Sequence, residues 1–133
     1  MTRVLTLAVV FGIALSWTAS PALATKQFGE QFKETYSKNE NKDFVKLVEE
    51  AKCNVCHIDG ENKKKRNEFG EAMATLLKKG DFPPDRFKKE PAKCKEEIET
   101  AFKKAESMPA KDKQTFGEKI KAGKLPGGDV KGK

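Results

Sequence analysis

The chain has 133 residues, of which 35% are charged, and its lysines and arginines outnumber its acids to give a formal net charge of +7 at pH 7. This length suits one small domain and excludes a large multidomain enzyme. Lysines alternate with glutamates along most of the chain, a pattern that is typical of the solvated surfaces of helices.

Residues 1–24 have the features of a secretory signal peptide. Arg3 supplies the positive start, residues 4–15 are nearly all apolar, and Ala22-Leu23-Ala24 forms a cleavage site of small residues. The apolar run is too short to span a bilayer comfortably. We therefore expect a periplasmic or otherwise exported protein whose mature domain covers residues 25–133. No later segment is apolar enough for a membrane span, so we expect that domain to be soluble.

Two helices are predicted before residue 52. Phe28, Phe32 and Tyr36 recur every four residues and indicate the first helix. Residues 37–41 then form a polar break that contains capping residues. The second helix shows apolar residues at the spacing i, i+3, i+4 and i+7, namely Phe44, Leu47, Val48 and Ala51. This helix would run directly into the next motif.

Cys53-Asn54-Val55-Cys56-His57 matches the signature for covalent attachment of a c-type haem. The two thiols can add to the haem vinyl groups as thioethers, and a helical turn would place both sulfurs near those groups. His57 is the only histidine of the chain and would be the proximal ligand of the iron. The motif therefore predicts one covalently bound haem c, held by Cys53, Cys56 and His57.

A basic run follows the motif, in a loop that begins near Gly60. It consists of Lys63, Lys64, Lys65 and Arg66. Such a run can steer an acidic redox partner, with an association rate that falls as salt rises. Nucleic-acid binding is disfavoured because the run has no interleaved aromatic residues and the chain is exported.

The next helix is predicted to begin after Asn67, which can act as its N-cap. Its apolar face comprises Phe69, Met73, Leu76 and Leu77. Gly80 is expected to end this helix in the C′ position, and Pro83-Pro84 prevents its continuation.

Two more helices are predicted in the last third of the chain. Pro91 suits the first turn of a helix, which should end before Pro109. The apolar face of that helix comprises Cys94, Ile98, Ala101, Phe102 and Ala105. Thr115 and Glu118 form a capping box for a short last helix that turns Phe116 and Ile120 inward. No strand and no internal repeat is expected.

The order of features along the chain resembles that of the class I monohaem cytochromes c. These features are a helix, the Cys53–His57 motif, a loop, further helices, Met108-Pro109 and a last helix. The resemblance implies a small all-α cytochrome c-like helical domain around one haem. It also implies that the helix through Phe44–Ala51 packs against the helix through Phe116–Ile120. In that family a proline soon after the motif supports the proximal histidine, whereas here no proline occurs before Pro83, so the partner of His57 Nδ1 stays open.

The sixth iron ligand decides between two kinds of haem protein. Met108 is preferred, since the resemblance places a distal methionine before a proline, and a His/Met haem suits electron transfer. Met73 is the less favoured methionine because it lies on an apolar helical face, where methionine is usually core filler. A lysine, Cys94 or an open site are the alternatives. An open site would give a five-coordinate haem that binds a small gas or peroxide.

Cys94 is the third cysteine and shares a helical face with Ile98 and Phe102, which predicts a buried, unreactive thiol. An intermolecular disulfide and a metal ligand are its alternatives. Cys53, Cys56, His57 and Cys94 could in principle form a zinc site, although two of these ligands are adjacent in the chain. A CxxC thiol oxidoreductase lacks its expected βαβ context.

The sequence thus favours an exported electron carrier over an enzyme. Its partners would be redox proteins with an acidic docking face, and its iron would pass one electron at a time through an exposed haem edge. The partners, the reduction potential and the oligomeric state leave no trace in the sequence.

Overall fold

The computed structural model describes residues 22–62 and 64–130, which form a small all-α domain with no named strand. Its helices are α1 (Ala22–Tyr36), α2 (Lys42–Ala51), α3 (Glu68–Leu76), α4 (Pro84–Lys89), α5 (Pro91–Glu106) and α6 (Phe116–Lys121). Two 3₁₀ turns, η1 (Lys52–Val55) and η2 (Lys79–Asp81), interrupt the connections. Most of the predicted signal peptide lies outside the described residues, and α1 begins at Ala22, within the predicted cleavage site.

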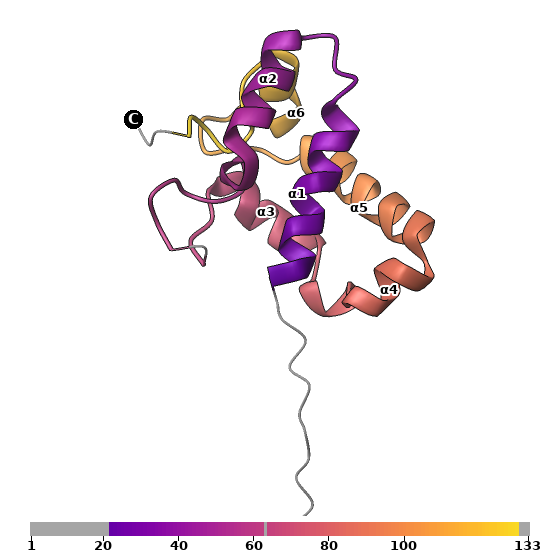
Figure 1. Ribbon diagram of the computed structural model, residues 1–133. Coiled ribbons are helices and arrows are strands. Elements are labelled where there is room, and N and C mark those ends of the chain that lie inside the picture. Colours follow the sequence, from indigo (N-terminus) through magenta and orange to yellow (C-terminus); the bar gives the residue numbers. More distant parts are fainter. Residues whose placement is uncertain (1–21, 63, 131–133) are drawn as a thin grey trace, which may run out of the picture.

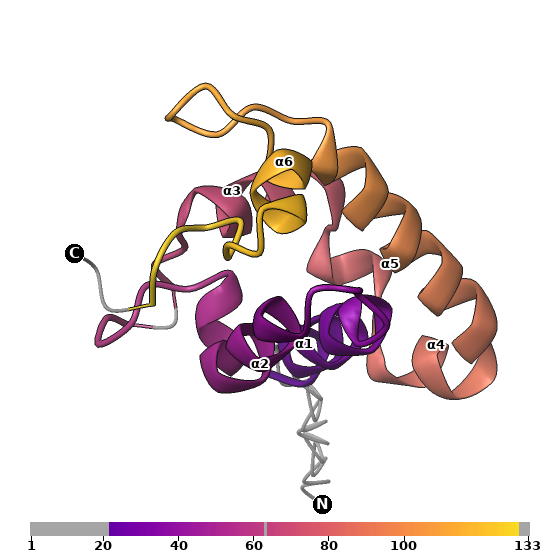
Figure 2. The same cartoon turned by 90° about the horizontal axis from the view of Figure 1, so that it is seen from above.

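Helix α1 lies between α2 and α5, as Figures 1 and 2 both show, and α3 packs on α5 from another side. Phe32 joins these layers. Its ring centroid lies 5.6 Å from that of Phe69 on α3 and 5.3 Å from that of Phe102 on α5. Such edge-to-face aromatic pairs add to the stability gained by burial. The predicted break at residues 37–41 is confirmed, and Asn41 caps α2 there by accepting hydrogen bonds from Asp43 N and Phe44 N.

Helix α2 buries Phe44, Val48 and Ala51, as its spacing predicts, but the prediction for Leu47 is wrong. Leu47 is 39% exposed because it lies at the edge of the stripe that faces α1. The helix also stops before the cysteine motif instead of running into it. Lys52 has a φ of +50°, which breaks the α-helical path and starts the tighter turn η1.

Helix α3 begins as predicted, because Asn67 Oδ1 accepts a hydrogen bond from Gly70 N. Its predicted end is wrong. Gly80 does not stop the helix, since Leu77 already has an extended backbone and buries its side chain in the core. Gly80 instead lies in η2 and has no positive φ. The short helix α4, with Pro84 in its first turn, is an element that the sequence patterns did not predict.

Helices α5 and α6 confirm their predicted bounds and faces. All five predicted apolar positions of α5 are buried, and α5 ends at Glu106, before Pro109. Thr115 and Glu118 form both hydrogen bonds of the capping box of α6. The packing implied for the helix pair is wrong: α6 packs chiefly on α5, with Phe116 against Phe69 of α3, while α2 packs on α1 and η1. The chain comes close to the start of α2 at the end of α6 and just after it, where Lys121 lines a cavity with residues 38–41 and Gly123 closely faces Asn41.

Candidate functional site

The segment Cys53–His57, here called the attachment segment, leaves α2 through η1. Cys53 O accepts hydrogen bonds from both Cys56 N (3.3 Å) and His57 N (3.1 Å), which closes the turn that the CxxCH spacing predicts. Both cysteines are free thiols, and their surroundings differ. Cys53 is exposed, whereas Cys56 is half-buried and packs against the hydrophobic core. Burial, together with the nearby Cys53, raises the pKa of Cys56 to about 12, and Arg66 only partly opposes this shift.

His57 is held by a backbone carbonyl that lies eight residues further along the chain. His57 Nδ1 is 3.2 Å from Lys65 O, which also accepts a hydrogen bond from Ile58 N at 3.4 Å. Since a carbonyl only accepts, Nδ1 is the nitrogen that donates here, and in the neutral ring Nε2 then carries the lone pair. The carbonyl of Lys65 is therefore the partner of His57 Nδ1 that the sequence left open. In metal sites this arrangement fixes the orientation of a histidine and raises its basicity as a ligand.

Two of the four residues of the basic run lie close to carboxylates. Lys63 lies outside the described residues, and Lys64 is exposed. Lys65 Nζ pairs with Glu61 Oε2 at 2.8 Å, and Arg66 Nη1 lies 3.9 Å from Glu71 Oε1. Two carboxylates therefore balance part of the positive charge on which the predicted docking surface depends.

The two methionines differ in their setting. Met73 is a 7% exposed member of the core, whereas Met108 is half-buried and packs against that core from the segment after α5. Residues 107–115, here called the Met108 loop, are closed by backbone pairs. Met108 N donates to Ala105 O (2.8 Å), and Met108 O accepts from Phe116 N (3.1 Å). Both methionines and Cys56 thus touch one hydrophobic cluster, from three different parts of the chain.

A buried ion network that the sequence analysis did not predict holds the Met108 loop. Lys119 of α6 is 7% exposed, and its Nζ lies 2.9 Å from both Glu68 Oε1 and Asp112 Oδ2. Glu68 also accepts a hydrogen bond from Lys111 N at 2.8 Å. Although its burial acts in the opposite direction, these donors lower the pKa of Glu68, and the two carboxylates raise the pKa of Lys119. The network joins the start of α3, the Met108 loop and α6.

Cys94 is fully buried on α5, as its helical spacing predicts. No group of three or more His, Cys, Asp or Glu side chains in residues 22–62 and 64–130 is arranged to hold a metal ion. Cys94 therefore does not join Cys53, Cys56 and His57 in the zinc site considered above. No helix in these ranges is long and apolar enough to cross a membrane.

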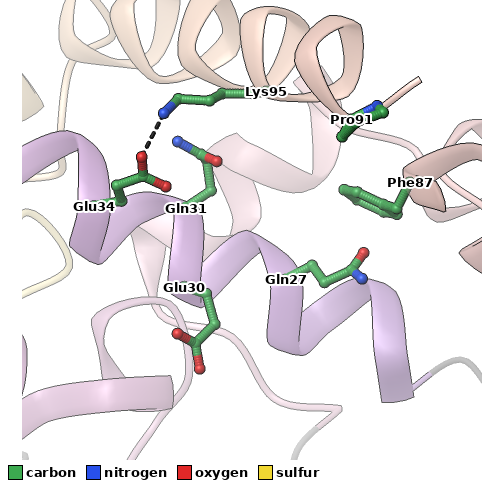
Figure 3. A pocket seen from close by; sticks show the side chains of 7 residues that line it. All are labelled: Gln27, Glu30, Gln31, Glu34, Phe87, Pro91 and Lys95. Atoms are coloured by element: carbon green, nitrogen blue, oxygen red, sulfur yellow. Dashed lines mark hydrogen bonds and ion pairs between the residues drawn. The ribbon is translucent and has the colours of Figure 1, made fainter. Parts of the chain in front are cut away.

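Two surface cavities lie away from the attachment segment. The first, of about 330 Å³, lies between α1, α4 and α5, where Lys95 and Glu34 form an ion pair at its rim (Figure 3). The second is formed by residues 38–41 together with Lys121. Neither cavity is lined by a cysteine, by His57 or by a methionine.

The residues of the attachment segment fit a covalently bound haem c in their chemistry. The segment presents two unpaired thiols on one turn. Its histidine has one nitrogen fixed by a carbonyl, and the other makes no hydrogen bond to the described part of the chain. These are the groups that two thioethers and one axial bond require.

No protein-family model matches the chain, and no characterised protein or solved structure is significantly similar to it. The chain's own residues and their geometry are therefore the only basis for assigning a function.

Proposed function

We propose that this protein is an exported monohaem c-type cytochrome that transfers one electron at a time. The observation that carries the proposal is the hydrogen bond from His57 Nδ1 to Lys65 O within a CxxCH turn. It supports a histidine that is oriented in advance as an axial ligand, which a merely structural histidine at the end of a turn does not need. The order of the motif, the helices and Met108-Pro109 along the chain is compatible with the same function.

Each residue of the site has a distinct role in this proposal. Cys53 and Cys56 bind the haem covalently, and His57 Nε2 is the proximal ligand. When bound, the haem would supply an iron that can cycle between the ferrous and ferric states. Met108 is the preferred distal ligand, because its loop lies outside the helices and its side chain is half-buried against the same core as Cys56. Met73, within α3, is the second candidate.

The proposed partners are redox proteins with an acidic face. The exposed Lys64, with its neighbours Lys63, Lys65 and Arg66, is the proposed docking surface, although Glu61 and Glu71 reduce its net charge. Charge reversal at Lys64 should therefore slow the reaction with an acidic partner at low salt, and this difference should vanish at high salt. A rate and salt dependence equal to those of the parent would remove the docking surface from the proposal.

The deciding experiment is an optical spectrum of the chain expressed with the haem-c maturation machinery, recorded oxidised and reduced. Matched samples carry Met108→Ala, Met73→Ala or Cys53→Ser with Cys56→Ser. We expect haem that stays on the denatured polypeptide and sharp low-spin bands in the reduced form. We also expect a weak red sulfur-to-iron band in the oxidised form that Met108→Ala abolishes and Met73→Ala keeps. Loss of this band in Met73→Ala alone would assign the ligand to α3 instead.

Two outcomes would contradict the proposal. A high-spin spectrum that shifts with carbon monoxide and ignores both methionine variants would indicate a five-coordinate haem that binds a gas or peroxide. A parent chain that carries no more covalent haem than the double serine variant would exclude a c-type cytochrome altogether.

A further inference from the structure

We propose that Asn67 is the positioning residue of the attachment segment, because its amide and backbone N–H bind three consecutive carbonyls of that segment. This role rests on the proposed function, since it concerns how the segment is presented to a haem. The sequence indicates Asn67 only as the cap of a helix. The structure adds a second set of contacts, which point away from that helix.

The three contacts are direct hydrogen bonds from one residue. Asn67 Nδ2 donates to Asn54 O (3.3 Å) and to Val55 O (2.9 Å), and Asn67 N donates to Cys56 O (3.0 Å). Carbonyls at the end of a helical turn have no partner within the turn and must be satisfied from outside. Asn67 supplies these partners, and it thereby fixes the backbone between the two cysteines and just before the histidine.

Asparagine is the side chain that meets both demands at this position. Its Oδ1 accepts from Gly70 N (2.9 Å) and caps α3, while its Nδ2 donates two hydrogen bonds in the opposite direction. Aspartate would keep the cap but would place a charged acceptor against two carbonyl oxygens. Serine would keep the cap and lose the reach to both carbonyls.

Two glycines enclose Asn67 and the segment it holds. A Cβ on Gly70 would lie 2.0 Å from Cys56 O, so the start of α3 contacts the segment's backbone directly. A Cβ on Gly127 would lie 2.2 Å from Asn67 Nδ2. The segment that carries Gly127 is anchored by the buried Leu125 and Pro126, and Figures 1 and 2 show it passing beside the loop that follows the cysteines. The C-terminal segment therefore keeps the amide of Asn67 in place.

Thiol labelling of the reduced, haem-free full chain at one fixed pH tests this role without depending on haem. Peptide mapping gives a separate rate for each cysteine. Asn67→Asp and Asn67→Ser remove the two amide donors and should raise the labelling rate of Cys56 by ~10-fold, since two neutral hydrogen bonds oppose local opening of the segment. The buried Cys94 serves as an internal standard for global unfolding and should not change.

Asn41→Asp is the matched control, because the Asn41 side chain also caps a helix but only accepts hydrogen bonds within the described part of the chain. It should leave the rate at Cys56 unchanged. In the haem-loaded protein, the two Asn67 variants should lower the fraction of chains with covalent haem and shift the reduction potential, whereas Asn41→Asp should do neither. A role confined to capping α3 would leave both quantities at the parent values.

Parent-like Cys56 rates in both Asn67 variants would overturn the proposal. If Cys94 becomes reactive together with Cys56, Gly127→Ala decides, since it displaces the side-chain amide of Asn67 while every residue of α3 and its cap keeps its identity. A selective rise at Cys56 in that variant, compared with Gly80→Ala in open space, supports the proposal, and an unchanged rate overturns it. A parent chain that takes up no haem would refute the proposed cytochrome function. It would not refute the positioning role of Asn67, because thiol labelling of the haem-free chain measures that role independently.

Discussion

Residues at the start of α3 hold both the attachment segment and the Met108 loop, but through different kinds of interaction. Asn67 holds the attachment segment through neutral hydrogen bonds to three carbonyls. Its neighbour Glu68 holds the Met108 loop through the buried ammonium of Lys119 and the backbone N–H of Lys111. Two consecutive residues at the start of α3 therefore set the relative position of the two halves of the proposed haem site.

The difference determines how each half responds to a change in conditions. Neutral hydrogen bonds from an amide to a carbonyl do not titrate, so the hold on the attachment segment should not depend on pH. The hold on the Met108 loop depends on three ionised groups, and removing one of them leaves another charged and partly buried. The two halves can therefore be disrupted separately, and the following variants are ordered by the size of their expected effect.

Gly70→Ala should cause the largest loss of stability, because it acts on the attachment segment through a backbone contact. The added methyl would lie 2.0 Å from Cys56 O and 2.9 Å from Cys56 C, and neither backbone atom can move without breaking the hydrogen bond to Asn67. We expect a loss of about 3 kcal/mol or more in the free energy of unfolding, measured by urea denaturation.

Gly29→Ala is its control, since nothing lies within 4 Å of a Cβ at this position of α1. It should raise the free energy of unfolding by about 0.5–1 kcal/mol, because alanine restricts the unfolded chain and favours the helix. A loss in Gly70→Ala no larger than about 1 kcal/mol would mean that α3 and the attachment segment are less closely packed than the structure indicates.

Lys119→Met should cause the next largest loss and should act on the Met108 loop. Methionine keeps most of the buried volume, but it leaves Glu68 ionised and partly buried without its ammonium partner. Breaking such a pair on one side costs about 3 kcal/mol. In the haem-loaded protein this variant should weaken the sulfur-to-iron band while the covalent haem stays attached.

Lys121→Met, on the same helix, separates the network from the general loss of a lysine. Lys121 is exposed, so this change should alter the free energy of unfolding by less than about 0.5 kcal/mol. Equal effects of the two substitutions would show that the network of Lys119 does not stabilise the Met108 loop.

The helices could be predicted from the sequence because their signals are local. The five buried positions of α5 follow from spacing alone, the cap at Asn67 follows from its residue type, and the cap at Thr115 follows from Glu118 three positions later. Glycine is a frequent helix end, so the local pattern favours Gly80, whereas the buried Leu77 ends the helix earlier. That choice depends on tertiary packing, which overrides a local preference.

The contacts that organise the site could not be predicted from the sequence, because their partners are far apart in the chain. Lys119 and Glu68 are separated by 51 residues, and a lysine in a lysine-rich helix is expected to be exposed. The sequence indicates Asn67 as a helix cap, but it does not indicate its hydrogen bonds to the attachment segment. The CxxCH motif can be recognised in the sequence, whereas the carbonyl that orients His57 belongs to the backbone of Lys65 and leaves no residue pattern.

The stability of the Met108 loop should depend on pH in the acid range. Because the folded state lowers the pKa of Glu68, its contribution is complete above the ordinary value of 4.5 and is lost as the pH falls through the lowered pKa. Asp112, whose pKa is also lowered, acts in the same direction. We expect the free energy of unfolding to fall by about 1–2 kcal/mol over this range from Glu68, the worth of a charged hydrogen bond.

Urea unfolding at a series of pH values, with Glu68→Gln and Glu71→Gln as a matched pair, measures this term. Glu68→Gln should reduce the decrease in the free energy of unfolding at acid pH, here called the acid limb, because an amide does not titrate there. Glu71, whose side chain is 63% exposed, should leave the limb unchanged when replaced. Identical acid limbs in all three proteins would assign the pH dependence to other carboxylates.

Thr115→Ala should cause the smallest loss, because it removes one of two reciprocal hydrogen bonds at the start of α6. The hydroxyl accepts from Glu118 N at 3.1 Å, while Thr115 N still donates to Glu118 at 2.7 Å. Loss of such a cap costs about 1 kcal/mol. Thr115 also pairs with Pro109 across the Met108 loop, so the cap stabilises the loop as well as the helix.

Two further threonine variants make this last effect specific. Thr115→Ser should restore the stability, since serine keeps the hydroxyl, and Thr100→Ala, exposed in the middle of α5, should be neutral or slightly stabilising. If Thr115→Ser is as unstable as Thr115→Ala, the methyl group and not the cap is responsible, and the Thr115 hydroxyl does not stabilise the Met108 loop. If serine restores stability, a neutral hydrogen bond to the Thr115 hydroxyl also stabilises the Met108 loop. The loop and the attachment segment then differ only in how much of their stability comes from charged groups.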